Sequence, residues 1–67
     1  MQNYTLYVYA QRAASVEAIQ VVVADASRAR AMAERMLTES SRRVAIEVTQ
    51  MGRNLFTVQP RPLGEPD

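Results

Sequence analysis

The sequence predicts an α+β fold in which a four-stranded antiparallel sheet carries one helix on one of its faces. Three observations favour it. Two segments rich in β-branched and aromatic residues come first, a segment of strong helix formers follows, and two more strand-like segments flank a glycine turn. The 67 residues, 48% of them hydrophobic, suffice for one small domain, expected over residues 1–59.

The first two predicted strands cover residues 4–10 and 16–24. In the first, leucine and valine alternate with Tyr7 and Tyr9, so the aliphatic and aromatic side chains point to opposite faces. In the second, the alternation places Val22 on the face opposite the isoleucine and its valine neighbours. Both strands therefore have one face suited to a core.

Residues 25–40 are predicted to form the helix. Asp25 is a good N-cap, because its side chain can accept hydrogen bonds from the free amides of the first turn. Alanine, methionine, leucine, arginine and glutamate fill the interior and favour a helix. At 100° per residue, one face gathers the residues expected to pack on the sheet: Ala26, Ala29, Ala33, Met36, Leu37 and Ser40.

Two further strands are predicted over residues 43–50 and 54–59, with a turn at Gly52, which accepts a positive φ. Residues 60–67 hold three prolines and a glycine. Such a composition excludes regular structure, so we expect a disordered tail.

The helix connects the second and third strands, which therefore run in the same direction. A purely antiparallel sheet results if the first strand lies between them, in the order 2-1-3-4. Tyr7 and Tyr9 then lie mid-sheet on the face that the helix leaves open, with Val22 and Leu55 nearby. The opposite face should hold the core: Leu6, Val8, Ile19, Val21, Val44, Ile46, Val48, Phe56 and Val58.

The composition argues against an enzyme. The chain has no histidine and no cysteine, which removes the commonest general base, nucleophilic thiols and the usual zinc ligands. The acidic residues lack the spacing of a metal-binding loop. We therefore expect no catalysis, no metal and no cofactor. The longest apolar run, VVVA, is too short for a membrane span, and a cytoplasmic protein is expected.

Two surfaces are candidates for binding. On the open sheet face, Tyr7, Tyr9, Val22 and Leu55 are interpreted as a contact area for a protein partner or a second copy, since tyrosine is enriched in interfaces. Base stacking on single-stranded nucleic acid and plain solvent exposure are the alternatives.

The second surface is the outward side of the helix. Arg28, Arg35 and Arg42 are spaced by seven and would form one stripe if the helix holds to its last turn. The stripe would bind phosphates or an acidic protein patch, or be an ordinary solvated face. The net charge of +1 argues against direct binding of nucleic acid.

The run VVVADASRARAMAERM followed by AIEVTQMGRNLFTV resembles small phage and mobile-element proteins of the anti-CRISPR type. The resemblance covers residues 4–59 and consists of two strands, a capped helix with spaced alanines, and a hairpin. It implies a non-enzymatic inhibitor in a bacterial cytoplasm that blocks a surface of a host defence nucleoprotein complex, such as a CRISPR surveillance complex. A homo-oligomeric accessory domain and a nucleic-acid-binding module are the alternatives.

Overall fold

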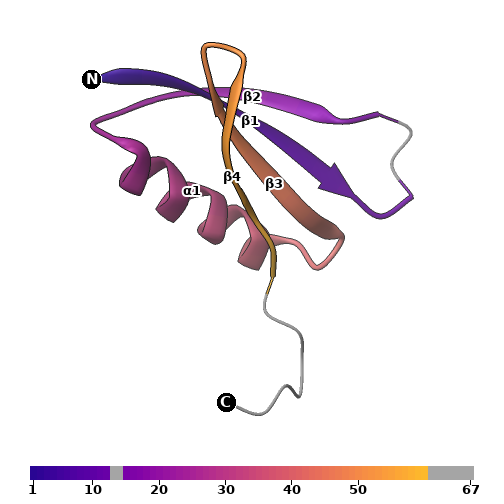
Figure 1. Ribbon diagram of the computed structural model, residues 1–67. Helices are drawn as coiled ribbons and strands as arrows, with labels where there is room; N and C mark the ends of the chain where they lie inside the picture. Colours follow the sequence, from indigo (N-terminus) through magenta and orange to yellow (C-terminus); the bar gives the residue numbers. More distant parts are fainter. Residues whose placement is uncertain (13–14, 61–67) are drawn as a thin grey trace.

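The computed structural model describes residues 1–12 and 15–60. In this part of the chain the elements follow in the order β1 (Gln2–Ala10), β2 (Glu17–Val23), α1 (Ala26–Glu39), β3 (Arg43–Gln50) and β4 (Arg53–Val58). The strands form one antiparallel sheet in the order β2-β1-β3-β4 (Figure 1). The predicted α+β class and strand order are confirmed. The predicted tail lies outside the described residues except for Pro60.

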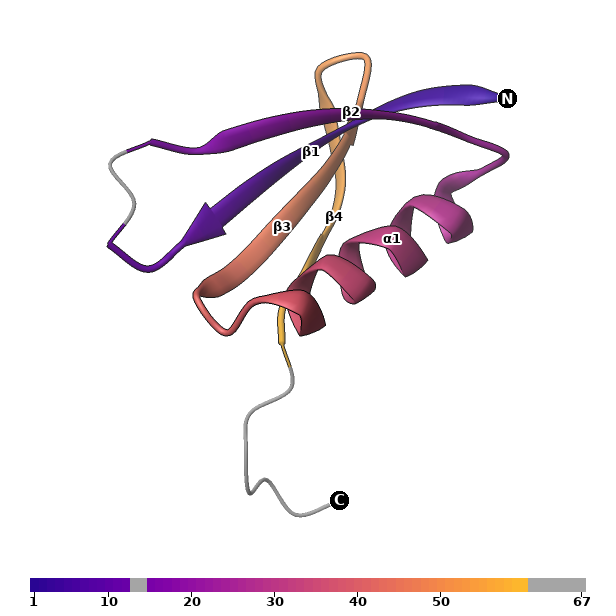
Figure 2. The same cartoon turned by 180° about the vertical axis from the view of Figure 1, so that it is seen from behind.

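The helix α1 runs across one face of the sheet, as the two opposite views show (Figures 1 and 2). Its first turn is capped as predicted, because the Asp25 carboxylate accepts a hydrogen bond of 2.9 Å from the Arg28 amide. Ala29 and Ala33 are fully buried against the sheet. Their small side chains let the helix axis approach the strands closely.

The other end of α1 is fastened by the first residue of β3. The Arg43 guanidinium donates a 2.6 Å hydrogen bond to the carbonyl of Met36, one of the last carbonyls of the helix. The same guanidinium lies 3.7 Å from the Glu39 carboxylate. The Arg43 side chain thus provides a hydrogen-bond donor for one terminal carbonyl of the helix and links the helix end to β3.

The core lies between α1 and the central strands β1 and β3. Tyr4 belongs to it, with 3% of its surface exposed, although it was not among the predicted core residues. Tyr4 shares the parity of Leu6 and therefore points toward the helix. The buried apolar residues are Tyr4, Leu6, Val8, Ala29, Ala33, Leu37, Ile46, Val48 and Val58.

The prediction that Val44 joins the core is wrong, since its side chain is 39% exposed. The cause is an irregularity in the β1–β3 ladder. Tyr9 pairs with Ala45, but the next residue, Ala10, pairs with Arg43, so Val44 has no partner. The extra residue interrupts the alternation and turns Val44 away from the helix.

The hairpin between β3 and β4 turns at Met51 and Gly52, as predicted. Both residues have positive φ, 53° and 78°, which is typical of the two-residue turn that matches strand twist. Beyond the turn the ladder shifts again: Thr49 pairs with Asn54, whereas Val48 pairs with Phe56, so Leu55 is the additional residue.

Candidate protein-interaction surface

The sheet face opposite α1 is left open by the described elements (Figures 1 and 2). Because β1 is central, Tyr7 and Tyr9 lie in the middle of this face, as predicted. Their side chains are 37% and 36% exposed, against 3% for Tyr4 on the helix side. Val22 and Leu55 are also exposed, on the two edge strands. The register sets Ala18, and not Val22, opposite Tyr7, and Val22 pairs with Asn3, so the prediction that Val22 lies close to the tyrosines is wrong.

Glu47 organises the centre of the face. It pairs with Tyr7 across the β1–β3 ladder, and its two carboxylate oxygens accept hydrogen bonds from different donors. The Tyr9 hydroxyl donates to one oxygen, and the Asn54 amide donates to the other at 2.5 Å. The carboxylate is therefore held in one orientation by side chains from β1 and β4.

The contact with Glu47 changes the acidity of Tyr9. The hydrogen bond donated to the carboxylate raises the pKa of Tyr9, and partial desolvation and the nearby negative charge add to it. All three effects favour the neutral hydroxyl, which can donate, over the phenolate, which cannot. Tyr9 is thus kept as a hydrogen-bond donor toward Glu47.

The face is otherwise uncharged. By strand register and alternation, Glu47 is the one charged residue of the described strands that lies on this side. Thr49 lies there too but is buried, and its hydroxyl donates a 3.0 Å hydrogen bond to the carbonyl of Thr5. Tyrosine rings and a fixed carboxylate both attract a cationic side chain. The negative charge of the carboxylate repels phosphate.

Asn54 was missed by the sequence reasoning, which placed it at the start of a regular strand. Strict alternation gives Asn54 and Phe56 the same face. The ladder shift at Leu55 breaks that alternation, so Asn54 reaches Glu47 while Phe56 packs against the core. The adjoining Gly52 turn was the available signal, because bulges often accompany tight hairpins.

The predicted stripe of three arginines is not formed. The helix ends at Glu39, so Arg42 lies beyond it, in the turn before β3, where its carbonyl accepts a 2.7 Å hydrogen bond from the Gln11 amide. Arg28 and Arg35 are on α1 and line a groove there. Arg30 stacks over the Phe56 ring, 4.7 Å from its centroid.

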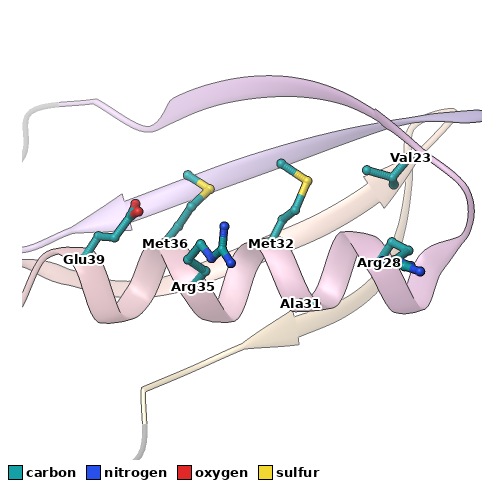
Figure 3. Close-up of a pocket in the computed structure, with 7 residues that line it drawn as sticks. All are labelled: Val23, Arg28, Ala31, Met32, Arg35, Met36 and Glu39. Carbon is teal, nitrogen blue, oxygen red and sulfur yellow. The ribbon is translucent and has the colours of Figure 1, made fainter.

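That groove, of about 470 Å³, lies between α1 and the end of β2 (Figure 3). Met32 and Met36 extend from the helix toward the strands, and Val23 closes one end. The sequence reasoning did not single it out. Met32 and Met36, four residues apart, share one side of α1 and were the available signal.

Residues 1–12 and 15–60 contain no group of three potential metal ligands. Within the same residues, α1 is too short and too polar to cross a membrane. Comparisons with protein-family models, with curated proteins and with solved structures found no match. Function is therefore inferred from the surfaces of the chain itself.

Proposed function

We propose that the chain is a non-enzymatic protein-binding domain whose contact area is the open sheet face. The observation that carries this proposal is the pair of exposed tyrosines around the oriented carboxylate of Glu47. Tyrosines bury much area for little conformational entropy, and such residues often dominate the energy of an interface. A negative charge among them selects a partner that presents arginine or lysine.

This chemistry agrees with the inhibitor function that the resemblance to anti-CRISPR proteins implies. Subunits that bind guide RNA or target DNA expose arginines and lysines along their grooves. A face with two tyrosines and one carboxylate can occupy such a groove and exclude the nucleic acid. The proposed role is therefore to block a surface of a host defence nucleoprotein complex directly. The same carboxylate makes base stacking by this face the weaker alternative.

The test is a binding assay with purified CRISPR surveillance complexes of several types, loaded with guide RNA. The wild-type chain should bind one of them and compete with its target DNA. The double change Tyr7→Ala and Tyr9→Ala should weaken binding at least tenfold, and Glu47→Lys should do the same by repelling the partner's basic groups.

Met51→Ala is the matched control, because Met51 is fully exposed in the hairpin turn, away from the tyrosines. It should bind as the wild type does. Retained binding by the double tyrosine variant would show that another surface makes the contact. If no complex binds the wild type, and expression in an immune strain gives phage no protection, the inhibitor function is wrong.

A further inference from the structure

The outer edge of β2 has no neighbouring strand among the described elements. Proteins usually guard such edges with charges, prolines or bulges. The other edge strand, β4, carries Arg53 and the Leu55 bulge. In β2, however, residues 18–23 contain no charge, proline or glycine, and the pairing with β1 is regular. The backbone of β2 is therefore open to pairing with another strand.

An apolar strip lies beneath this edge on the helix side. Ile19, Val21 and Val23 point toward α1 but remain half-exposed, because the helix packs mainly over β3. The groove that Met32 and Met36 line runs alongside (Figure 3). A strand added at β2 would continue this apolar row and cover part of it.

We propose that the occupant is a second copy of the chain, joined through antiparallel pairing of β2 with β2 on a twofold axis at Gln20. Gln20 is the central residue of Glu17–Val23, so this register pairs all seven residues. It sets Gln20 against Gln20 and Ile19 against Val21 of the second copy. Ile19, Val21 and Val23 of both strands then lie on the same face of the sheet, the one that carries the helices.

Charge complementarity favours a second copy over an unrelated strand. Glu17 pairs with Val8 and so lies on the helix side of the sheet, at one end of β2. Arg28 lies beside Val23, at the other end. The twofold axis sets Glu17 of each copy against Val23 of the other, and hence near its Arg28. Among residues 1–12 and 15–60 the ion pair is that of Arg43 with Glu39, so Glu17 and Arg28 form none with this part of the chain.

The dimer would be a continuous eight-stranded sheet with both helices on one face and both tyrosine pairs on the other. This goes beyond the proposed function, because it uses a different surface and a different partner. It would also present two binding faces side by side, and a partner with repeated subunits would then be held by both.

Sedimentation equilibrium of the full chain over a wide concentration range tests the dimer. The wild type should dimerise reversibly. Gln20→Lys places two like charges across the axis and should weaken the dimer at least tenfold, and Gln20→Glu should do the same. An equimolar mixture of the two variants should regain the dimer, because opposite charges then meet at the axis.

Thr57→Lys is the matched control: it adds the same charge to the exposed face residue of the other edge strand, and it should dimerise normally. Glu17→Arg or Arg28→Glu alone should weaken the dimer, and both together should restore it. Circular dichroism verifies that each variant is folded. A monomeric wild type, or equal effects of Gln20→Lys and Thr57→Lys, would overturn the proposal. Loss of the dimer in Tyr7→Ala/Tyr9→Ala with none in Gln20→Lys would assign self-association to the tyrosine face instead.

Discussion

At the scale of single residues, Glu47 links the fold to the candidate surface. Its backbone belongs to the central pair of strands, while its carboxylate receives hydrogen bonds from Tyr9 and Asn54. A carboxylate held by two donors loses little further freedom when it meets a partner's cation. Preorganisation of this kind improves affinity by lowering the entropy cost of binding.

The link between Glu47 and Tyr9 predicts a shifted titration. Tyr9 should ionise above the ordinary tyrosine value of about 10. Because the folded-state pKa is raised, the stabilising contribution is present below the unfolded pKa and is lost as pH rises through the folded one. Glu47→Gln should return the pKa of Tyr9 toward the ordinary value, measured by NMR of the labelled ring. Glu34→Gln, on the helix, is the control and should leave it unchanged.

A second prediction at this scale concerns Met51, whose φ of 53° is left-handed. This conformation costs a residue with a side chain about 1–2 kcal/mol, and asparagine tolerates it best after glycine. Met51→Asn should therefore raise the free energy of unfolding, by about 1 kcal/mol at most. Met51→Ala keeps the strained backbone and should be close to neutral. Equal stabilities of the two variants in urea melts would argue against the turn geometry.

At the scale of elements, the distance between the helix and the sheet is set by small side chains on the buried side of the helix. Ala29 and Ala33 have no exposed surface, and the core cluster to which they belong includes side chains of β1, β3 and β4. A helix that docks through alanines lies close to the sheet. A larger side chain at these positions can be accommodated only if the whole helix moves away from the strands. The spacing between α1 and the strands thus depends on two methyl groups.

Enlarging one of these alanines tests the docking. Ala33→Leu should lower the free energy of unfolding by about 1–3 kcal/mol, because the core has no room for the added carbons. Ala31→Leu is the matched control, since Ala31 is exposed on the same helix and leucine is a good helix former. Thermal melts of both variants measure the difference. A neutral Ala33→Leu would contradict the helical phase.

The elements and their order could be predicted from the sequence because alternation, helix propensity and the Asp25 cap all indicate the same segments. The predictions failed where the ladder is irregular. The faces on which Val44 and Asn54 lie are set by register shifts in the sheet. Such shifts arise only when two strands pair, so the alternation within one strand does not reveal them. Arg42 was misplaced because its spacing continues the helix, whereas the chain leaves it after Glu39 to reach β3.

At the scale of the whole molecule, the sheet separates two kinds of surface. One face packs on a helix and holds Tyr4, and the other holds Tyr7 and Tyr9 in the open. In so small a domain, the stability rests on the few buried side chains of the covered face. Substitutions on the open face can therefore alter binding with little effect on folding, which makes the proposed interface testable.

This separation predicts unequal effects of three equal truncations. Tyr4→Ala removes a buried aromatic ring and should destabilise the fold by about 3–5 kcal/mol, enough to unfold much of the population. Tyr7→Ala and Tyr9→Ala should each cost far less, because those rings are partly solvated. Urea denaturation followed by circular dichroism measures all three. A Tyr7→Ala variant as unstable as Tyr4→Ala would contradict the assignment of faces.

The place of β1 between β2 and β3 has a consequence for the speed of folding. Thr5 and Thr49 meet across 44 residues of chain, so the central ladder closes a long loop before its contacts can stabilise it. We expect refolding to be slow for a domain of this length. Until β3 arrives, the inner edge of β1 is exposed beside a finished β1–β2 hairpin. At high protein concentration that edge can accept β3 from another molecule, so the yield of refolded monomer should fall with concentration even though the native sheet is stable.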